Sequence, residues 1–406
     1  MQFLGFMLRN AIVLLVAASA LSQVPNLPSP SYQFSSDGAS IHIPVEIIAG
    51  GLVFIQAKTN GHPGWFIVDN GTQGFLVDRD YARESSLQSS GNAVTREVGS
   101  DTSQAGIVRD VNISVPGLEL THRNLLVIDL KSLEPAVGHT VDGIIGSRLF
   151  DDFVVVVDYE HSLLSIYSPK EYRPSGNETS LPVRVDQHGF QYVDATITLP
   201  GVPPVTGSFL IDGGANYYAN IYKPFSDAHH LPPSTMKLLD DPGPQPSREG
   251  RAGRIEVGPY SVKDPPITFA QDTEGLMAAK EYAGLVGAKF LERFIVVFDT
   301  PGRRILLTPN GKYRSPAEYD ESGLRIRAER PGFHRFVVKR VMPGSPAVEA
   351  GIEPGDVIES LDNHSAQDMT LTQLRNLLSR PKARYLVTVA RGSNRLQVTL
   401  QLRPLL

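Results

Sequence analysis

The stretch "WFIVDNGTQGF", residues 65–75, ends an apolar run with one acid, Asp69, and a glycine follows two residues later. The stretch "SFLIDGGANYY", residues 208–218, repeats this pattern around Asp212. A carboxylate at the end of an apolar strand is unfavourable to bury unless it has a partner. Two copies of the pattern in one chain therefore predict that the two aspartates face each other.

A second pair of segments repeats at nearly the same spacing. Residues 143–169, "GIIGSRLFDDFVVVVDYEHSLLSIYSP", align with residues 284–310, "GLVGAKFLERFIVVFDTPGRRILLTPN". The matched positions, each pair 141 residues apart, are Gly146 with Gly287, Phe153 with Phe294, and Asp158 with Asp299. Repeats of this kind indicate one structural unit that occurs twice.

Each unit is rich in short β-branched or alternating apolar runs that are separated by Gly, Pro, Asn and Asp, which is typical of β-strands. Short helices are expected only just after each apolar-apolar-Gly triplet. We therefore expect a mainly β fold with two duplicated β lobes, at residues 40–178 and 179–314, followed by an α+β module at residues 315–406.

The paired landmarks resemble the aspartic proteases, and specifically the retropepsin-like aspartyl proteases of bacteria. Each unit has apolar-apolar-Asp-x-Gly and then, about 75 residues later, apolar-apolar-Gly. The resemblance covers both lobes and implies that Asp69 and Asp212 are catalytic. It implies an active-site turn on each lobe, made of Asn70, Gly71 and Thr72 on the first and Gly213, Gly214 and Ala215 on the second.

The chemistry explains why two carboxylates are needed. Two carboxylates a few ångströms apart cannot both ionise, so they share one proton. The ionised member takes a proton from water, and the water attacks the scissile carbonyl, while the protonated member binds the carbonyl oxygen. This endopeptidase chemistry requires no metal and no cofactor. The polar stretches 96–108 and 242–257 are expected to form hairpin flaps over a cleft that binds a peptide or protein substrate.

The sequence departs from the family pattern beside each aspartate. The family has Thr or Ser directly after each Asp, and its hydroxyl bonds to the opposite lobe. Asn70 can still donate and accept hydrogen bonds, whereas Gly213 has no side chain, so one of two cross-braces should be missing. An alternative therefore stays open: a catalytically inactive peptide-binding or scaffold protein that uses the same cleft and the C-terminal module.

The stretch "VMPGSPAVEAGIEPGDVIESLDN", residues 341–363, resembles PDZ domains of the bacterial protease type. PDZ domains add a peptide as a β-strand and hold its terminal carboxylate in a nest of backbone amides. The matching loop contains Gly323, Leu324, Arg325 and Ile326. Capture of protein C-termini is the functional prediction, and docking within the molecule is the alternative.

The N-terminal segment and the overall composition give further predictions about the location and the partners of the protein. Residues 1–23 combine Arg9 with a short apolar run and small residues, which predicts a cleaved signal peptide, with residues 24–39 as a linker. A retained membrane anchor is the alternative, but no stable span is expected after cleavage. The mature protein is then periplasmic or secreted. The net charge of −5 gives no reason to expect nucleic acid, the chain has no cysteine, and no metal-ligand spacing was found around its histidines.

Overall fold

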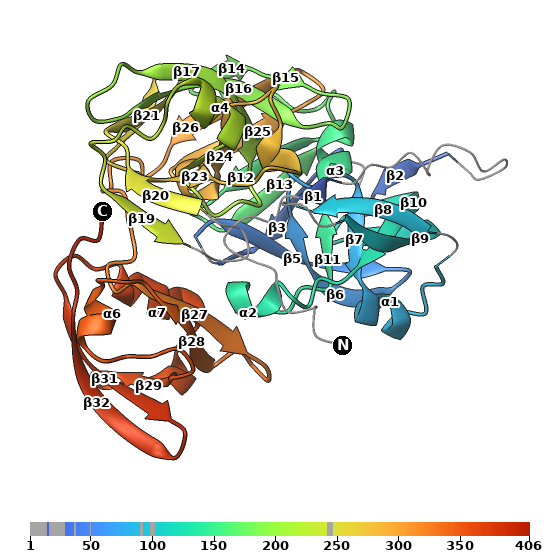
Figure 1. Ribbon diagram of the computed structural model, residues 1–406. Coiled ribbons are helices and arrows are strands. Elements are labelled where there is room, and N and C mark those ends of the chain that lie inside the picture. Colours follow the sequence, from blue (N-terminus) through green and yellow to red (C-terminus); the bar gives the residue numbers. More distant parts are fainter. Residues whose placement is uncertain are drawn as a thin grey trace.

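The computed structural model describes residues 14–15, 29–35, 38–48, 50–89, 92–97, 102–241 and 247–406 (Figure 1). The predicted signal peptide therefore lies outside the described residues except for Leu14–Leu15, and so does part of the predicted linker. The fold is mainly β, as expected. We call residues 40–178 the first lobe, residues 179–314 the second lobe and residues 315–406 the C-terminal module.

A ten-stranded sheet forms most of the first lobe. Its order is β1-β8-β9-β10-β7-β11-β6-β5-β4, and β2 pairs with β10. The strands are β1 (Leu14–Leu15), β2 (Ser31–Phe34), β4 (Glu46–Ile48), β5 (Leu52–Thr59), β6 (His62–Val68), β7 (Phe75–Asp78), β8 (Asn92–Glu97), β9 (Thr102–Val115), β10 (Leu118–Ile128) and β11 (Gly143–Ile145).

A second ten-stranded sheet forms most of the second lobe. Its order is β19-β20-β23-β18-β24-β17-β16-β21-β22, and β15 pairs with β16. The strands are β15 (Arg184–Val185), β16 (Gln191–Thr198), β17 (Val205–Asp212), β18 (Ala219–Ile221), β19 (Leu238–Asp241), β20 (Ser247–Arg251), β21 (Arg254–Val257), β22 (Tyr260–Lys263), β23 (Pro266–Ala270) and β24 (Gly284–Gly287).

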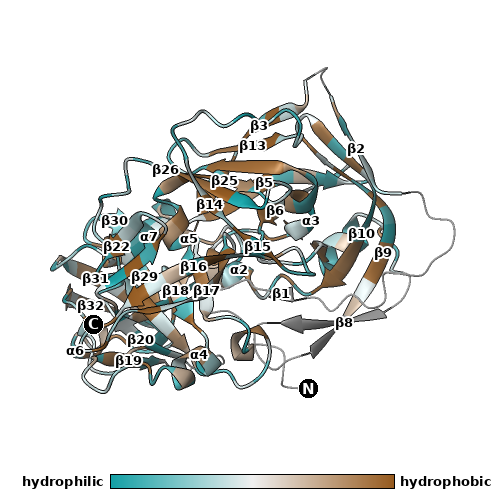
Figure 2. Ribbon diagram, turned by 90° about the horizontal axis from the view of Figure 1, so that it is seen from above, coloured by the Kyte–Doolittle hydropathy of each residue, from teal (hydrophilic) through white to brown (hydrophobic). Residues whose placement is uncertain are grey.

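A six-stranded sheet joins the two lobes, in the order β14-β26-β25-β12-β13-β3. Its strands are β3 (Ser40–Pro44), β12 (Val154–Asp158), β13 (Leu163–Tyr167), β14 (Thr179–Pro182), β25 (Phe294–Asp299) and β26 (Arg304–Pro309). The repeated strands β12 and β25 pair with each other, with Val156 opposite Val297. Strands β5, β6 and β25 are mainly hydrophobic (Figure 2), and one core continues from the first lobe into the second. The two lobes therefore share this sheet and one hydrophobic core.

The strands around the two aspartates have the same arrangement. Asp69 directly follows β6, which is parallel to β11, and β7 pairs with the other side of β11. Asp212 ends β17, which is parallel to β24, and β18 pairs with the other side of β24. A Cβ on Gly146 would stand 2.3 Å from the Thr72 carbonyl oxygen, and one on Gly287 would stand 2.3 Å from the Ala215 carbonyl oxygen. Glycine thus lets each inner strand pass close beneath the turn that follows the aspartate.

Helices are short and few, as the sequence predicts. Helix α3 (Ser147–Asp152) and helix α5 (Ala288–Leu291) follow the two apolar-apolar-Gly triplets. The other helices of the lobes are α1 (Arg79–Glu84), α2 (Glu134–Val137), α4 (Lys223–Ala228) and the 3-10 helix η1 (Leu276–Ala278). In the described part of the chain, no helix has the length and apolar character to cross a membrane.

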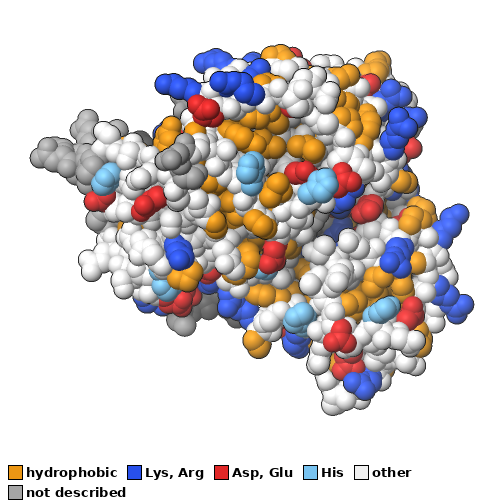
Figure 3. All heavy atoms as spheres, turned by 180° about the vertical axis from the view of Figure 1, so that it is seen from behind, with side chains coloured by type: hydrophobic (Ala, Val, Ile, Leu, Met, Phe, Trp, Pro, Cys, Tyr) orange, Lys and Arg blue, Asp and Glu red, His pale blue; other side chains and the backbone are white. Residues whose placement is uncertain are grey.

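The C-terminal module has its own sheet and its own core. The sheet order is β27-β28-β29-β31-β32, and β30 pairs with β29. The elements are β27 (Leu324–Glu329), β28 (Arg335–Val341), α6 (Pro346–Glu349), β29 (Val357–Leu361), β30 (His364–Ser365), η2 (Ala366–Asp368), α7 (Leu371–Leu378), β31 (Arg384–Arg391) and β32 (Asn394–Gln401). Helix α7 buries Leu371, Leu374 and Leu378 on one face, as predicted. In Figure 3 this module stands against the lower right of the two lobes.

Candidate active site

The turns after Asp69 and Asp212 face each other across the boundary between the lobes. A Cβ on Gly71 would stand 2.4 Å from Oδ1 of Asp212, and a Cβ on Gly214 would stand 2.2 Å from Cγ of Asp69. Each glycine therefore lies directly against the carboxyl group of the opposite lobe, at a distance that no side chain tolerates. Both aspartates are fully buried. The two carboxyl groups are close enough that each affects the pKa of the other.

The first-lobe turn supplies Asp69 with two hydrogen-bond donors. The Gly71 backbone N–H donates to Oδ1 of Asp69 at 2.8 Å. The Thr72 hydroxyl donates to Oδ2 of the same carboxyl group at 2.7 Å. The backbone N–H of Asp69 donates to the Ile145 carbonyl at 3.0 Å, which fixes the turn to β11. Thr72 thus contacts the carboxyl group directly.

The second-lobe turn supplies fewer donors to Asp212. The Gly214 backbone N–H donates to Oδ1 of Asp212 at 2.9 Å. Ala215, at the position that corresponds to Thr72, has no hydroxyl to offer. Within the described residues, the other carboxyl oxygen, Oδ2, has no direct protein donor. The two carboxyl groups therefore differ in their surroundings although their backbones correspond.

Burial affects the protonation of both carboxyl groups. It raises the pKa of Asp69 from 3.8 to about 6, while the donors at Thr72 and Gly71 oppose the rise. Burial, followed by the negative charge of Asp69, raises the pKa of Asp212 well above 3.8. Because the groups interact strongly, they titrate as a pair. Burial and their mutual charge therefore make the pair bind protons more tightly than two isolated carboxyl groups do.

Asn70 bridges the lobes with both ends of its amide. Its Nδ2 donates to the Ile211 carbonyl at 2.6 Å, and its Oδ1 accepts the Gly213 N–H at 2.8 Å. A Cβ on Gly213 would stand 3.2 Å from this Oδ1, so the missing side chain at position 213 leaves room for the larger amide. One residue thus makes two hydrogen bonds between the lobes, from the first lobe alone.

Sequence reasoning missed Tyr159, which directly follows the repeated Asp158. Tyr159 is buried, and its hydroxyl lies 4.0 Å from the position that a Cβ on Gly213 would occupy. Burial, the charge of Glu292 and then that of Asp212 raise the pKa of this tyrosine, so it stays protonated. The sequence did contain one signal for this residue, because an aromatic side chain directly follows a repeated acid. Its position near the turn of the opposite lobe could not be predicted, because it depends on the pairing of β12 with β25.

The predicted flap regions form hairpins. Strand β8 pairs with β9 in the first lobe, and β19 pairs with β20 in the second. Residues 98–101 and 242–246, which connect these strands, lie outside the described residues. Their role over a cleft stays a prediction.

The predicted carboxylate loop of the C-terminal module already contacts acids of the chain itself. The Gly323 N–H donates to Oδ1 of Asp320 at 3.0 Å, and the Leu324 N–H donates to the Ser322 hydroxyl at 3.0 Å. The Arg325 guanidinium forms an ion pair with Glu249 of the second lobe at 3.1 Å. Ile326 lines the same cavity as Leu324 and Arg325. A role of these four loop residues in peptide binding stays a prediction.

Comparison with known families agrees with this geometry. Residues 337–391 match the family model of the PDZ domain. A search among curated proteins found no match to the chain. Residues 55–149, which include Asp69 and its turn, match the family model of the aspartyl protease, so both resemblances found in the sequence are confirmed.

Proposed function

We propose that the chain is an exported aspartic-type endopeptidase in which Asp69 and Asp212 activate a water molecule. One observation carries the proposal: two buried carboxyl groups, one from each lobe, lie side by side at matching turns, each against the glycine of the other lobe. Burial of two acids in contact is costly. Such an arrangement is typical of a site that needs a shared proton.

The difference between the two turns supports a division of roles. Asp69 accepts two hydrogen bonds that favour its ionised form. Asp212 accepts a hydrogen bond from the Gly214 N–H but none from a side-chain hydroxyl, and burial and the charge of Asp69 raise its pKa well above 3.8. Asp69 is then the base that takes a proton from the attacking water. Asp212 carries the shared proton and donates it toward the oxygen of the scissile carbonyl, and later toward the leaving amine.

Other parts of the chain support the proposed setting. Residues 1–23 have the pattern of an export signal, so we place the mature enzyme in the periplasm or outside the cell. The C-terminal module is similar to PDZ domains, and we propose that it binds peptides or protein C-termini. The chemistry needs only the two carboxyl groups and water, without a metal or cofactor.

A cleavage assay tests the proposal. The mature chain is incubated with an unstructured protein at several pH values, and the new termini are identified by mass spectrometry. Asp69→Asn and Asp212→Asn should each lower the rate at least about a hundredfold, and pepstatin should inhibit the native chain. The control is Asp227→Asn, at an exposed acid in α4, which should leave the rate unchanged.

The same assay separates the two candidate functions. Cleavage that persists in both aspartate variants would overturn the enzyme assignment. If the native chain binds the unstructured protein but leaves it intact at every pH, the inactive peptide-binding alternative holds.

A further inference from the structure

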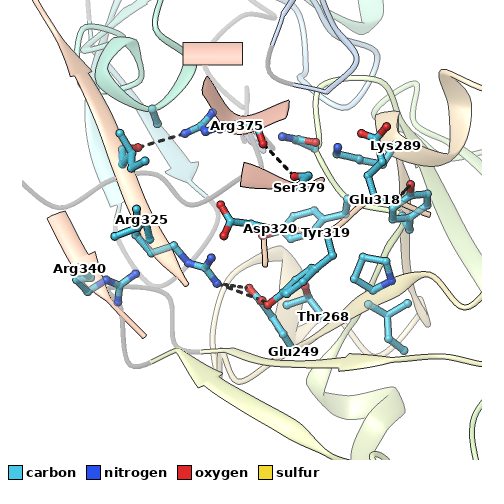
Figure 4. Close-up of a pocket in the computed structure, with 18 of the residues that line it drawn as sticks. Glu249, Thr268, Lys289, Glu318, Tyr319, Asp320, Arg325, Arg340, Arg375 and Ser379 are labelled. Carbon is cyan, nitrogen blue, oxygen red and sulfur yellow. Dashed lines mark hydrogen bonds and ion pairs between the residues drawn. The ribbon is translucent and has the colours of Figure 1, made fainter. Parts of the chain in front are cut away.

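A cavity of about 220 Å³ lies where both lobes meet the C-terminal module (Figure 4). The first lobe contributes Ala136 of α2, and the second lobe contributes Asn216 and Tyr217, which directly follow the turn of Asp212. Strands β27 and β28 of the module supply another part of the wall. A substrate that reaches the two aspartates can therefore extend into a space that the module helps to enclose.

Lys289 and Asn216 lie together at the end of this cavity that is next to the second-lobe turn. The Tyr217 carbonyl accepts the N–H of Lys289 at 3.1 Å, which holds Lys289 beside the segment that follows the turn. A Cβ on Gly50 of the first lobe would stand 2.7 Å from Cε of Lys289 and 2.6 Å from Oδ1 of Asn216. Both side chains thus meet at the boundary between the lobes.

Both side chains have a polar group that a ligand can satisfy. Over the part of the chain that the structure describes, the ammonium group of the half-buried Lys289 makes no hydrogen bond or ion pair. Oδ1 of Asn216 is buried, and it too has no hydrogen-bond partner among the described residues. A polar atom that is buried without a partner is unfavourable. An acidic peptide offers both missing partners, a carboxylate for the ammonium group and a backbone N–H for the amide oxygen.

The C-terminal module adds positive charge across the cavity. In Figure 4, Arg325, Arg340 and Arg375 lie on the side opposite Lys289. Arg325 of β27 and Arg340 of β28 are directly opposite each other, and like charges in such a pair repel. Burial and then the charge of Arg325 lower the pKa of Arg340. Burial lowers the pKa of Arg375 to about 10. Negative charge in the cavity would therefore stabilise these guanidinium groups.

The acids of the cavity wall do not balance its positive charge. Six Lys and Arg residues line the cavity against three Asp and Glu residues. Glu249 is already held by Arg325 at 3.1 Å and by the Tyr319 hydroxyl at 2.7 Å. Asp320 accepts three hydrogen bonds from its own turn. The wall as a whole therefore favours an acidic ligand.

We propose that this cavity is a specificity subsite of the proposed peptidase, which selects substrates with an acidic side chain a few residues from the scissile bond. The Lys289 ammonium group pairs with the carboxylate of that side chain, and Oδ1 of Asn216 accepts a backbone N–H of the same substrate segment. The arginines of the module supply the surrounding positive charge. The inference rests on the proposed function, because it names the substrate that the site of Asp69 and Asp212 prefers.

A profile of cleavage sites tests the subsite. The native chain is incubated with the tryptic peptides of a denatured proteome, and mass spectrometry identifies each cut. Asp and Glu should be enriched at least about fivefold at one position on one side of the cut, because a charge-assisted pair forms there. Lys289→Gln should lower kcat/KM for peptides with an acid at that position at least about fivefold more than for peptides without one. Lys263→Gln, at an exposed lysine of β22, should keep the native preference.

A binding experiment tests the same site without catalysis. The full chain carrying Asp69→Asn is titrated in a calorimeter with Ala-Glu-Ala-Glu-Ala-Glu-Ala and with its Gln counterpart. Both heptapeptides are acetylated and amidated, so neither has a terminal carboxylate. The Glu peptide should bind at least about tenfold more tightly than the Gln peptide. Lys289→Gln and Arg340→Gln should each reduce this advantage at least about threefold, and Lys263→Gln should not reduce it.

The outcomes separate this inference from the proposed function. Cleavage without a preference for acids, or a preference that Lys289→Gln leaves in place, overturns the subsite while the peptidase stands. Equal binding of the Glu and Gln peptides also overturns it, and this comparison requires no variant of the cavity to fold. If Arg340→Gln keeps the full advantage of the Glu peptide, the module has no part in the selection. If no peptide is cut but the Glu peptide binds through Lys289, catalysis fails and the acidic-peptide site holds.

Discussion

Asn70 of the first lobe and Gly213 of the second are joined by a hydrogen bond of 2.8 Å from the Gly213 N–H to Oδ1 of the Asn70 side chain. The other end of the same amide donates to Ile211, directly before Asp212. The turns that carry Asp69 and Asp212 are therefore held in register by one side chain that has no counterpart on the second lobe. In the family pattern two hydroxyls, one on each lobe, make the hydrogen bonds between the turns. In this chain the Asn70 side chain alone makes them.

Asn70→Ala should cost about 2–4 kcal/mol of folding stability, because it leaves a buried N–H and a buried carbonyl without partners. It should also lower kcat by at least about tenfold, since catalytic groups held loosely lose rate steeply. Asn70→Thr keeps a hydroxyl and should lose less on both measures. Urea unfolding and cleavage kinetics check this, with Asn394→Ala, at an exposed asparagine, as the control. Native-like rates in Asn70→Ala would show that the bridge does not align the aspartates.

Thr72→Val should move the acid side of the pH–rate profile to higher pH. The Thr72 hydroxyl favours the ionised form of Asp69, so its removal raises the pKa of Asp69 and protonates the base over a wider acid range. The profile of kcat/KM reports this pKa in the free enzyme. Thr72→Ser keeps the donor and should keep the native profile. A profile that stays in place in Thr72→Val would mean that Asp69 is not the group that must be ionised.

The sequence was sufficient to locate the two aspartates, their turns and the short helices, because each depends on local patterns: an apolar strand, a glycine and a fixed spacing. It also identified the buried face of α7 from the spacing of its leucines. The internal duplication itself stays a prediction, although the strands around Asp69 and Asp212 are arranged alike.

Contacts between distant segments could not be predicted in the same way. The pairing of β12 with β25 depends on two strands that are each apolar and β-branched and could equally have paired elsewhere. The occupation of the Gly323 amide by Asp320 depends on a carboxylate three residues away, whose turn geometry the PDZ resemblance does not specify. The contact of Gly138 with Leu371 joins domains whose relative position no local pattern encodes.

Gly214→Ala should disrupt the site much more than Gly253→Ala. The added methyl group at position 214 would overlap the Asp69 carboxyl group, with 2.2 Å between the new Cβ and Cγ, and both lie in a fully buried region. At position 253 the nearest atom is a backbone oxygen at 3.5 Å, which is an ordinary contact. Overpacking of this kind costs about 1–3 kcal/mol or more. Thermal unfolding should show a clear loss for Gly214→Ala alone, together with loss of cleavage. Equal stability of the two variants would mean that the turns do not meet as described.

Because the pKa of Asp69 is raised in the folded state, ionisation of Asp69 lowers the folding stability at neutral pH. An acid whose pKa is higher in the folded state than in the unfolded chain binds protons more tightly when folded, so stability falls as pH rises from the unfolded value of 3.8 to the folded value of about 6. A shift of this size corresponds to a loss on the order of 3 kcal/mol, complete above pH 6. Asp69→Asn removes the titrating group and should therefore be more stable than the native chain at pH 7, with little of this advantage at pH 4. Urea unfolding at the two pH values measures the difference, and Asp240→Asn supplies the baseline for an exposed acid. If the stability difference between the native chain and Asp69→Asn is the same at both pH values, burial does not raise the pKa of Asp69 as inferred.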